Sequence, residues 1–492
     1  MKDKVTIGID IGTSGCKVLA LRADGSIAAS ATEGYPLYQP QQGWTEQEPT
    51  DWWEAAAKGS RRVMSDIGDA EVAGVSFSGQ MHGMVALDRE LRVIRRAPLW
   101  NDQRTQSQCD EITEAAGGLE GLLGFTNNMM LTGYTGGKIL WMREKEPENF
   151  ERTYKIVNPK DYVRLMMTGE LCTEVSDASG VGLFDVGRRC WSEPLLERIG
   201  LSKALFGDVL ESVDLAGRVT AEAAELTGIP EGTSVFAGGG DAVLSVLGLG
   251  ITAPGTIGVT LGTSGVVAAA PDRYAQNPGG MLQFFCGNAP GRWMAFGTTL
   301  FAAGSYQWFH DTIGAGKSFR ELDAMAAEVE PGCGGLVFLP YLNGERCPIF
   351  DPNARGVFAG IHSTMGLGHF ARAVLEGVCF SQKQVFDAIS SAMPSMVCDS
   401  VSVAGGGAKS PLWRQMLADI FGCPVHTVFG SAEGGSFGAA LVARVGSGLS
   451  SSLDEATELV KAETEILPDP ANAEVYSERY ARYISVWPPY SC

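Results

Sequence analysis

The sequence predicts an α/β protein of two domains, and three observations lead to this fold class. The chain has 492 residues, whereas a single hydrophobic core rarely grows beyond about 250–300 residues. Two β-rich runs, Val5–Leu21 and Gly255–Ala270, carry the same Gly-Thr-Ser-Gly turn. Strand and helix patterns mix after each run. We therefore expect two related domains, each opening with a β-hairpin.

The segments after each hairpin have recognisable signals. Residues 70–83, AEVAGVSFSGQMHG, predict a strand that enters a loop. Ser410 and Pro411 are typical residues for an N-cap and a first helical position, so they predict a helix after a strand and a glycine turn. The mostly apolar stretch 368–390 predicts a long helix packed on a sheet.

No low-complexity linker separates the two halves. We place the boundary near Val235–Asp241, with an N-terminal domain at 1–238 and a C-terminal domain at 239–492. The joint is expected to be a compact hinge over a cleft.

Composition excludes several classes of protein. The net charge is −19, which argues against nucleic acid or an anionic membrane surface as a partner. The 11 cysteines form no C-x-x-C pair and the 5 histidines no metal cluster, which suits a reducing cytosol better than a disulfide framework or a zinc site.

The uncharged stretch Ala242–Pro271 is interrupted by Pro254, so we expect buried helix and strands there. The start, MKDKVTIGID, lacks the apolar region of a signal peptide. A cytoplasmic protein is expected.

The two Gly-Thr-Ser-Gly turns predict phosphate binding. Glycine turns let backbone N–H groups approach phosphate oxygens, and hydroxyls add donors. Asp10 precedes the first turn, where a carboxylate suits Mg²⁺ held beside phosphates, and Lys17 follows it. One such turn alone is also typical of a structural hairpin, and a Walker A loop is absent. Together with GGGAKS, the two copies predict an adenine nucleotide held between the domains. The expected nucleotide-binding residues are Gly12, Thr13, Ser14, Lys17, Gly262, Thr263, Ser264, Gly405, Gly406, Gly407 and Ala408.

The chain resembles the FGGY carbohydrate kinases, and within them the xylulokinases, over nearly its whole length. The resemblance runs in order through GIDIGTSG, WTEQEP, GQMHG, LWNDQR, KILW, PKDY, SDASG, GGGD, LGTSG, FLPYLNGERCP and GGGAKSPLWRQMLAD. Gly356–Glu376 matches the C-terminal pattern of the family throughout, and the pattern around Lys138–Lys145 departs only at Lys145. The assignment to the xylulokinases depends mainly on QMHG and WNDQR.

This resemblance implies two actin-like (ribonuclease H-like) domains that close over sugar and ATP. It implies an ATP-dependent, Mg²⁺-requiring sugar kinase that converts D-xylulose to D-xylulose 5-phosphate. Related enzymes are often dimers, so a homodimer is a further expectation.

By the same resemblance, Asp241 in GGGD is the catalytic base, and it is also a candidate Mg²⁺ ligand with Asp10. A carboxylate can orient a sugar hydroxyl and accept its proton as the γ-phosphoryl group is transferred. An aspartate at a helix start can equally serve only as a cap. The family usually follows this aspartate with Asn, whereas Ala242 stands here, which leaves the identity of the sugar open.

The resemblance also implies the residues that contact the sugar. His82 would donate to sugar hydroxyls and Met81 would pack on the carbon skeleton. Trp100 would wall the pocket, although tryptophan is more often a core residue. Asp102 would hydrogen-bond the sugar, or would form an ion pair with Arg104 that orders the loop. The motifs PKDY and GERCP are expected to be structural.

Three alternatives stay open from the sequence. The first is the same reaction on another pentulose or polyol, such as ribulose, which Ala242 motivates. The second is an actin-like ATPase whose nucleotide state controls a partner. The third is a sugar-binding protein without catalysis.

Overall fold

The computed structural model describes residues 3–487, and they form two compact units. Unit 1 comprises residues 1–252, 283–294 and 433–460. Unit 2 comprises residues 253–282, 295–432 and 461–492. The chain therefore passes between the units more than once, and a boundary between residues 238 and 239 stays a prediction.

The sheet of unit 1 has the strand order β13-β14-β5-β1-β2-β3. β1 and β2 form an antiparallel hairpin, β2 pairs antiparallel with β3, and β1 pairs parallel with β5. A short additional strand, β15, also runs parallel to β5. The bounds are β1 (Lys4–Ile11), β2 (Gly15–Arg22), β3 (Ile27–Gly34), β5 (Glu71–Gly79), β13 (Leu215–Arg218), β14 (Ser234–Phe236) and β15 (Gly239–Gly240).

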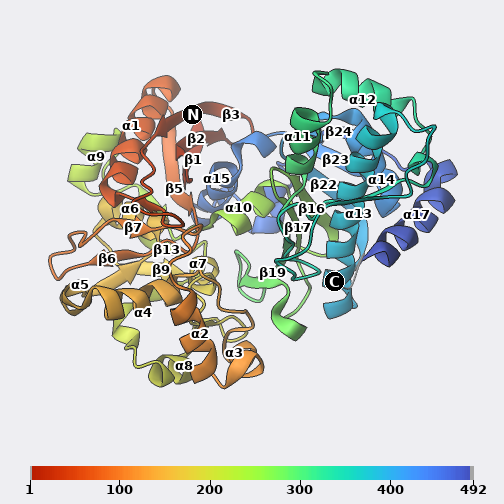
Figure 1. The fold of residues 1–492 in the computed structure, drawn as a ribbon. Coiled ribbons are helices and arrows are strands. Elements are labelled where there is room, and N and C mark those ends of the chain that lie inside the picture. The colour runs from red at the N-terminus through yellow and green to blue at the C-terminus, as the bar shows by residue number, and fades with distance from the viewer. Residues whose placement is uncertain (1–2, 488–492) are drawn as a thin grey trace. The chain divides into compact units, whose positions relative to one another are not determined.

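Helices cover this sheet. One core forms between the sheet and α1, and includes Trp52, Ile7 and Phe77. A second core forms around α15 and α10, and includes Leu244 and Phe437. Figure 1 shows α15, which is blue because it belongs to the C-terminal part of the chain, beside the red strand β1 near the N-terminus. The bounds are α1 (Pro49–Ile67), α6 (Pro159–Thr168), α9 (Ala221–Thr227), α10 (Asp241–Gly248), α15 (Gly435–Gly446) and α16 (Leu453–Thr457).

Short helices and two-stranded sheets complete unit 1. The strand pairs are β4–β7, β6–β8, β9–β12 and β10–β11. The strand bounds are β4 (Glu46–Gln47), β6 (Val85–Leu87), β7 (Ala97–Pro98), β8 (Lys155–Val157), β9 (Cys172–Glu174), β10 (Phe184–Asp185), β11 (Cys190–Trp191), β12 (Asp208–Leu210) and β18 (Gln283–Cys286). The helix bounds are α2 (Gln106–Ala115), α3 (Gly118–Thr126), α4 (Thr135–Lys145), α5 (Pro147–Arg152), α7 (Val175–Ser179) and α8 (Glu193–Arg198).

The sheet of unit 2 repeats the same pattern, with the order β19-β17-β16-β22-β23-β24. β16 and β17 form the hairpin, β17 pairs antiparallel with β19, and β16, β22 and β23 are parallel. The strand bounds are β16 (Gly255–Leu261), β17 (Gly265–Ala269), β19 (Trp293–Thr299), β20 (Val337–Leu339), β21 (Val357–Ala359), β22 (Cys398–Ala404), β23 (Val425–Val428) and β24 (Ala462–Ile466). The helix bounds are α11 (Ala303–Thr312), α12 (Phe319–Ala327), α13 (Leu367–Ala392), α14 (Pro411–Phe421) and α17 (Ala473–Val486).

These elements confirm the expectations for local structure. Both Gly-Thr-Ser-Gly segments are hairpin turns, and each hairpin is extended by a parallel strand. Ser410 caps α14 by accepting the N–H of Trp413 at 3.3 Å, and Pro411 begins that helix. The two repeated sheets are those of two actin-like (ribonuclease H-like) domains, as expected. Within residues 3–487 no helix combines the length and apolar character needed to cross a bilayer.

Candidate active site

Three parallel strands of unit 1 end at the same edge of their sheet. In the pairing of β1 with β5, Asp10 lies opposite Ser78, and in the pairing of β15 with β5, Gly239 lies opposite the same residue. The chain leaves β15 directly into α10, whose first residue is Asp241. The two carboxyl groups are therefore neighbours, and the charge of Asp10 acts on Asp241.

Asp241 is the first residue of its helix rather than the cap. Gly240 has the extended backbone of the N-cap position, and the Asp241 carboxylate accepts the N–H of Ala242 at 2.7 Å. Burial of the carboxyl group, reinforced by the negative charge of Asp10, raises the pKa of Asp241 from 3.8 to about 7. A carboxyl group with a pKa near neutrality can exchange protons at physiological pH.

The Asp10 carboxylate is buried, and Ser78 lies beside it. Burial raises the pKa of Asp10, against the opposing effects of a hydrogen bond with Ser78 and of the charge of Lys17. The Lys17 ammonium lies 3.3 Å from the carboxylate of Glu433. A buried carboxylate with the carboxyl group of Asp241 nearby fits Mg²⁺, which takes one or two carboxylates and keeps several waters. In the described part of the chain, no group of three or more His, Cys, Asp and Glu side chains is arranged to hold a metal ion by itself.

The turn after β1 is braced by side chains from elsewhere in unit 1. The Trp100 ring N–H donates to Thr13 Oγ1 at 3.0 Å, and the Gln47 amide donates to the Thr13 carbonyl at 2.8 Å. Gly12 N–H donates to the carbonyl that closes the turn at 3.1 Å. Ser14 is exposed. Trp100 is itself 45% exposed, so it is a surface group tied to this turn and not a core residue.

Met81 and His82 follow β5 at the same edge. Met81 packs against the backbone at Gly240, where an added Cβ would lie 2.6 Å from the Met81 side chain. The His82 ring stacks on Tyr134 with ring centroids 4.5 Å apart. His82 Nδ1 lies 2.7 Å from the carbonyl of Gly180, and it must donate because a carbonyl only accepts. In this tautomer the neutral ring has its acceptor at Nε2.

Asp102 is buried, and both of its carboxylate oxygens already have protein partners. It accepts the backbone N–H groups of Thr45 at 2.7 Å and of Arg104 at 3.0 Å. The Arg104 guanidinium adds two further bonds at 2.8 and 2.6 Å. These contacts support the ion-pair alternative, in which Asp102 orders the loop.

In unit 2, the two predicted glycine turns lie together. β16 and β22 are parallel neighbours, and Thr260 lies opposite Ala404, so the turns that follow them share an edge. Gly405 has φ +91°, and an added Cβ there would lie 2.6 Å from the Leu261 carbonyl oxygen. Gly405 and Gly406 are exposed, as are Thr263 and Ser264, whereas Gly407 and Ala408 are buried. The N–H groups at the start of α11 bind the backbone of the hairpin turn, with Ala303 donating to the Gly262 carbonyl at 2.8 Å.

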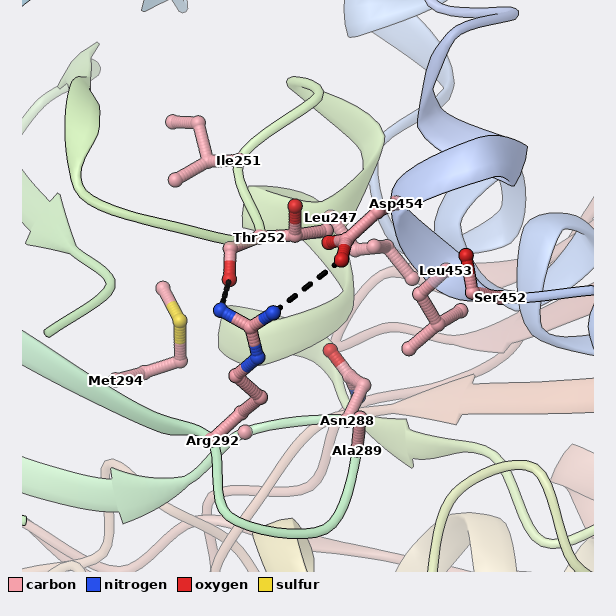
Figure 2. A pocket seen from close by; sticks show the side chains of 11 residues that line it. Leu247, Ile251, Thr252, Asn288, Ala289, Arg292, Met294, Ser452, Leu453 and Asp454 are labelled. Atoms are coloured by element: carbon pink, nitrogen blue, oxygen red, sulfur yellow. Dashed lines mark hydrogen bonds and ion pairs between the residues drawn. The ribbon is translucent and has the colours of Figure 1, made fainter. Parts of the chain in front are cut away.

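A separate cavity of about 90 Å³ in unit 1 contains none of the predicted site residues. Leu247 and Ile251 line it at the far end of α10 from Asp241. Figure 2 shows the Arg292 guanidinium between the Thr252 carbonyl, at 3.4 Å, and Asp454, at 3.2 Å.

Sequence reasoning assigned no role to several residues that hold the site. Ser176 and Gly180 bind the segments that carry Asp241 and His82. Gln80 binds Gln47 at 2.8 Å beneath the first turn. These residues lie in the motifs SDASG and GQMHG, but only the buried contacts distinguish them from ordinary polar residues.

Comparisons with known proteins show the family of the chain. Residues 5–248 match the N-terminal domain, and residues 258–447 the C-terminal domain, of the FGGY family of carbohydrate kinases. The xylulose kinase of Lactococcus lactis subsp. lactis (strain IL1403) is 38% identical over 486 residues, covering 98% of this chain and 96% of that protein.

Two solved structures share the fold. A protein described as a xyloylose kinase from Brucella ovis has a TM-score of 0.92 and 31% identity, with 99% of each chain covered. The gluconate kinase from Lactobacillus acidophilus has a TM-score of 0.91 and 26% identity, with 99% of this chain and 98% of that chain covered. The chain belongs to the FGGY family of carbohydrate kinases, and it is an ATP-dependent sugar kinase.

Proposed function

We propose that the protein transfers the γ-phosphoryl group of ATP to D-xylulose, with Asp241 as the general base. The observation that carries this proposal is the Asp241 carboxyl group, which begins α10 beside Asp10 and has a pKa raised to about 7. The choice of D-xylulose as the sugar rests on the similar protein from Lactococcus lactis, which is a xylulose kinase.

In the proposed reaction, Asp241 orients the 5-hydroxyl of the sugar and accepts its proton. The hydroxyl oxygen forms a bond to the γ-phosphorus as the bond from that phosphorus to the β-phosphate oxygen breaks. The products are D-xylulose 5-phosphate and ADP, with the proton on Asp241. A base whose pKa lies near the working pH combines a useful ionised fraction with sufficient basicity.

The sugar would lie against Met81 and His82 in this proposal. A neutral His82 that donates from Nδ1 to Gly180 would accept a sugar hydroxyl at Nε2 rather than donate to it. The ring is held by its stacking on Tyr134, which fixes the direction of that acceptor. Trp100 would border the site beside the first turn.

Asp10 would hold Mg²⁺, with Asp241 as the second carboxylate. When bound, the ion would offset the negative charge of the ATP phosphates. The turns at residues 12–14, 262–264 and 405–408 would bind the nucleotide through backbone N–H groups and hydroxyls, and Lys17 would add positive charge. The exposure of Ser14, Thr263 and Ser264 supports this role.

A homodimer and a cytoplasmic location are also part of the proposal. Every cysteine within residues 3–487 is a free thiol, which suits a reducing compartment. Light scattering of the purified protein tests the dimer, because a mass equal to one chain would refute it.

The experiment that tests the substrate is ADP release with Mg-ATP. D-xylulose, L-xylulose, D-ribulose, L-ribulose, glycerol and gluconate are compared with a sample without sugar. We expect D-xylulose to exceed the others in kcat/KM by at least tenfold, or about 1.4 kcal/mol of transition-state discrimination. Equal ADP release without sugar would instead indicate an ATPase.

A different sugar is the second candidate, and two observations favour it. Ala242 occupies the position after the base where the family usually has Asn, and the similar structure from Lactobacillus acidophilus is a gluconate kinase. If another sugar gives the highest kcat/KM, the Ala242→Asn variant shows whether this position sets the choice. A shift of preference toward D-xylulose in that variant would assign the difference to the missing amide.

A further inference from the structure

The backbone that carries Asp241 is held by a buried serine. The Gly240 N–H donates to Ser176 Oγ at 2.9 Å. The Ser176 hydroxyl in turn donates to the Glu174 carboxylate at 2.9 Å. Ser176 and Glu174 are fully buried, so water does not compete for these bonds. The residue before the candidate base is thus fixed by a two-step chain of hydrogen bonds.

Ser176 is fixed by its own surroundings. Glu174 accepts the backbone N–H groups of Ser176 at 2.6 Å and of Asp177 at 2.7 Å, which closes the start of α7. The Lys160 ammonium lies 3.3 Å from Glu174 and 2.6 Å from Asp161. In a low-dielectric interior such contacts hold each group in one geometry.

The same buried cluster holds the other end of the segment before Asp241. Arg164 pairs with Asp161 at 2.9 Å and donates to the carbonyl of Ala237 at 2.8 Å. The backbone from Ala237 to Gly240 is therefore held at both ends. Lys160 also lies 3.2 Å from Asp177, whose pKa is raised by burial against the opposing charge of Lys160.

The end of α7 reaches the other side of the candidate site. The Gly180 carbonyl, directly after the helix, accepts His82 Nδ1–H at 2.7 Å. The Ser179 hydroxyl accepts the N–H of Cys286 at 3.1 Å. One short helix thus contacts the segment that carries Asp241 and the residue that is expected to face the sugar.

We propose that Ser176 is a positioning residue for phosphoryl transfer, which holds Asp241 in register with the sugar hydroxyl through the Gly240 N–H. This inference rests on the proposed role of Asp241 as the base. Without the Ser176 hydroxyl, Gly240 has no acceptor at this position and the start of α10 can move. Misplacing a reacting group by about 1 Å can cost roughly 10²-fold in rate.

The test compares Ser176→Ala with Ser176→Cys and with a matched control. Ser60 is a fully buried serine of unit 1 whose hydroxyl has no hydrogen-bond partner in the described structure, so Ser60→Ala removes a hydroxyl without removing a bond. ADP release is measured with Mg-ATP and D-xylulose, or with the sugar that replaces it in the panel above. Thermal melting of each variant confirms that it is folded.

We expect Ser176→Ala to lower kcat by about 10- to 100-fold with both KM values changed less than about twofold. Ser176→Cys keeps most of the volume but offers only a weak hydrogen-bonding sulfur, so it should lose kcat as well. Ser60→Ala should keep the kcat of the wild type. Full kcat in Ser176→Ala would overturn the proposal, because the hydroxyl would then not be needed. Full kcat in Ser176→Cys alone would also overturn it, because packing and not the hydrogen bond would then matter.

A double-mutant cycle separates this proposal from the role of Asp241. If Ser176 acts through Asp241, adding Ser176→Ala to Asp241→Asn should lower kcat no further. If the two losses multiply, Ser176 acts independently and the positioning role is wrong. If Asp241→Asn alone retains kcat, the general-base proposal fails, whatever the serine variants show.

Discussion

Replacing Asp241 by asparagine should abolish most activity and, at alkaline pH, stabilise the protein. Asparagine keeps the oxygen that accepts the Ala242 N–H at 2.7 Å, but it can neither take the proton of the sugar hydroxyl nor carry a charge. Loss of a general base typically costs 10²–10⁴-fold in rate, or about 3–5 kcal/mol of barrier. We therefore expect kcat to fall by that factor.

The gain in stability follows from the direction in which folding moves the pKa. The pKa of Asp241 is raised from 3.8 to about 7 in the folded state. Ionising this carboxyl group is therefore less favourable in the folded protein than in the unfolded chain, and the difference lowers the free energy of unfolding. A tenfold change in proton affinity corresponds to about 1.36 kcal/mol, and the penalty above pH 7 therefore has a ceiling of about 4 kcal/mol. The penalty fades as the pH falls from 7 toward 4, because the folded protein then keeps the proton.

The assay is calorimetric melting in metal-free buffer between pH 5 and pH 8, alongside kinetics with Mg-ATP. We expect Asp241→Asn to melt several degrees above the wild type at pH 8, with a smaller difference at pH 5. Asp88→Asn is a control of opposite sign, because hydrogen bonds from the Arg92 backbone lower the pKa of Asp88. That variant should melt below the wild type by about the same amount from pH 5 to pH 8, because the pKa of Asp88 lies below 3.8 and its carboxylate stays ionised throughout this range.

Two results would refute this reasoning. A kcat within tenfold of the wild type would mean that Asp241 is not the base. A melting difference that stays the same from pH 5 to pH 8 would mean that the charge of Asp241 carries no penalty in the folded protein.

Three further substitutions test other parts of the structure. Gly435→Ala places a Cβ 2.0 Å from Ser78 Oγ and 2.8 Å from Asp10 Oδ1, so Ser78 and Asp10 must shift. We expect a loss of about tenfold or more in kcat/KM for Mg-ATP, measured by ADP release. Trp100→Phe removes the 3.0 Å bond to Thr13, which should raise the KM for ATP by about fivefold, equivalent to one hydrogen bond of about 1 kcal/mol. Burial lowers the pKa of Lys138 from 10.5 to about 7, so the unfolded chain binds more protons between these values. The unfolding free energy of the wild type should therefore rise from pH 7 to pH 10 relative to Lys138→Met, with a ceiling of about 5 kcal/mol.

Each of these predictions has a contradicting outcome. Gly124 has no atom within 4 Å of an added Cβ, so Gly124→Ala is the control for Gly435→Ala, and equal kinetics in the two would refute the steric argument. An unchanged KM for ATP in Trp100→Phe would show that Trp100 does not contribute to nucleotide binding. Parallel pH curves for the wild type and Lys138→Met would show that Lys138 is charged in the folded protein.

The sequence by itself determined the local elements of this protein. Each hairpin is made by residues that are neighbours along the chain, with Ile11 opposite Cys16 and Leu261 opposite Gly265. The glycine turn and the residues beside it are enough to specify such a structure. The motifs spread along the chain were equally sufficient to indicate the FGGY family.

Only the tertiary structure decided how these elements are supported. α15 packs on β1, and Thr6 donates to the carbonyl of Ala440 at 3.0 Å across 434 positions of the chain. The Ser176 bond to Gly240 likewise joins segments 64 positions apart. Hydrophobic periodicity does not specify which distant segments meet, because many pairings bury similar apolar area.

The chemical state of the site was also decided by tertiary structure. The family resemblance predicted Asp241 as the base, but the pKa of this residue depends on burial and on the charge of Asp10, which belongs to another strand. It named Asp102 as a sugar ligand or an ion pair, and the protein donors around that carboxylate favour the ion pair. The physical reason is the same for both: a carboxylate's behaviour is set by the charges and donors that folding brings to it, and these come from residues far away in the sequence.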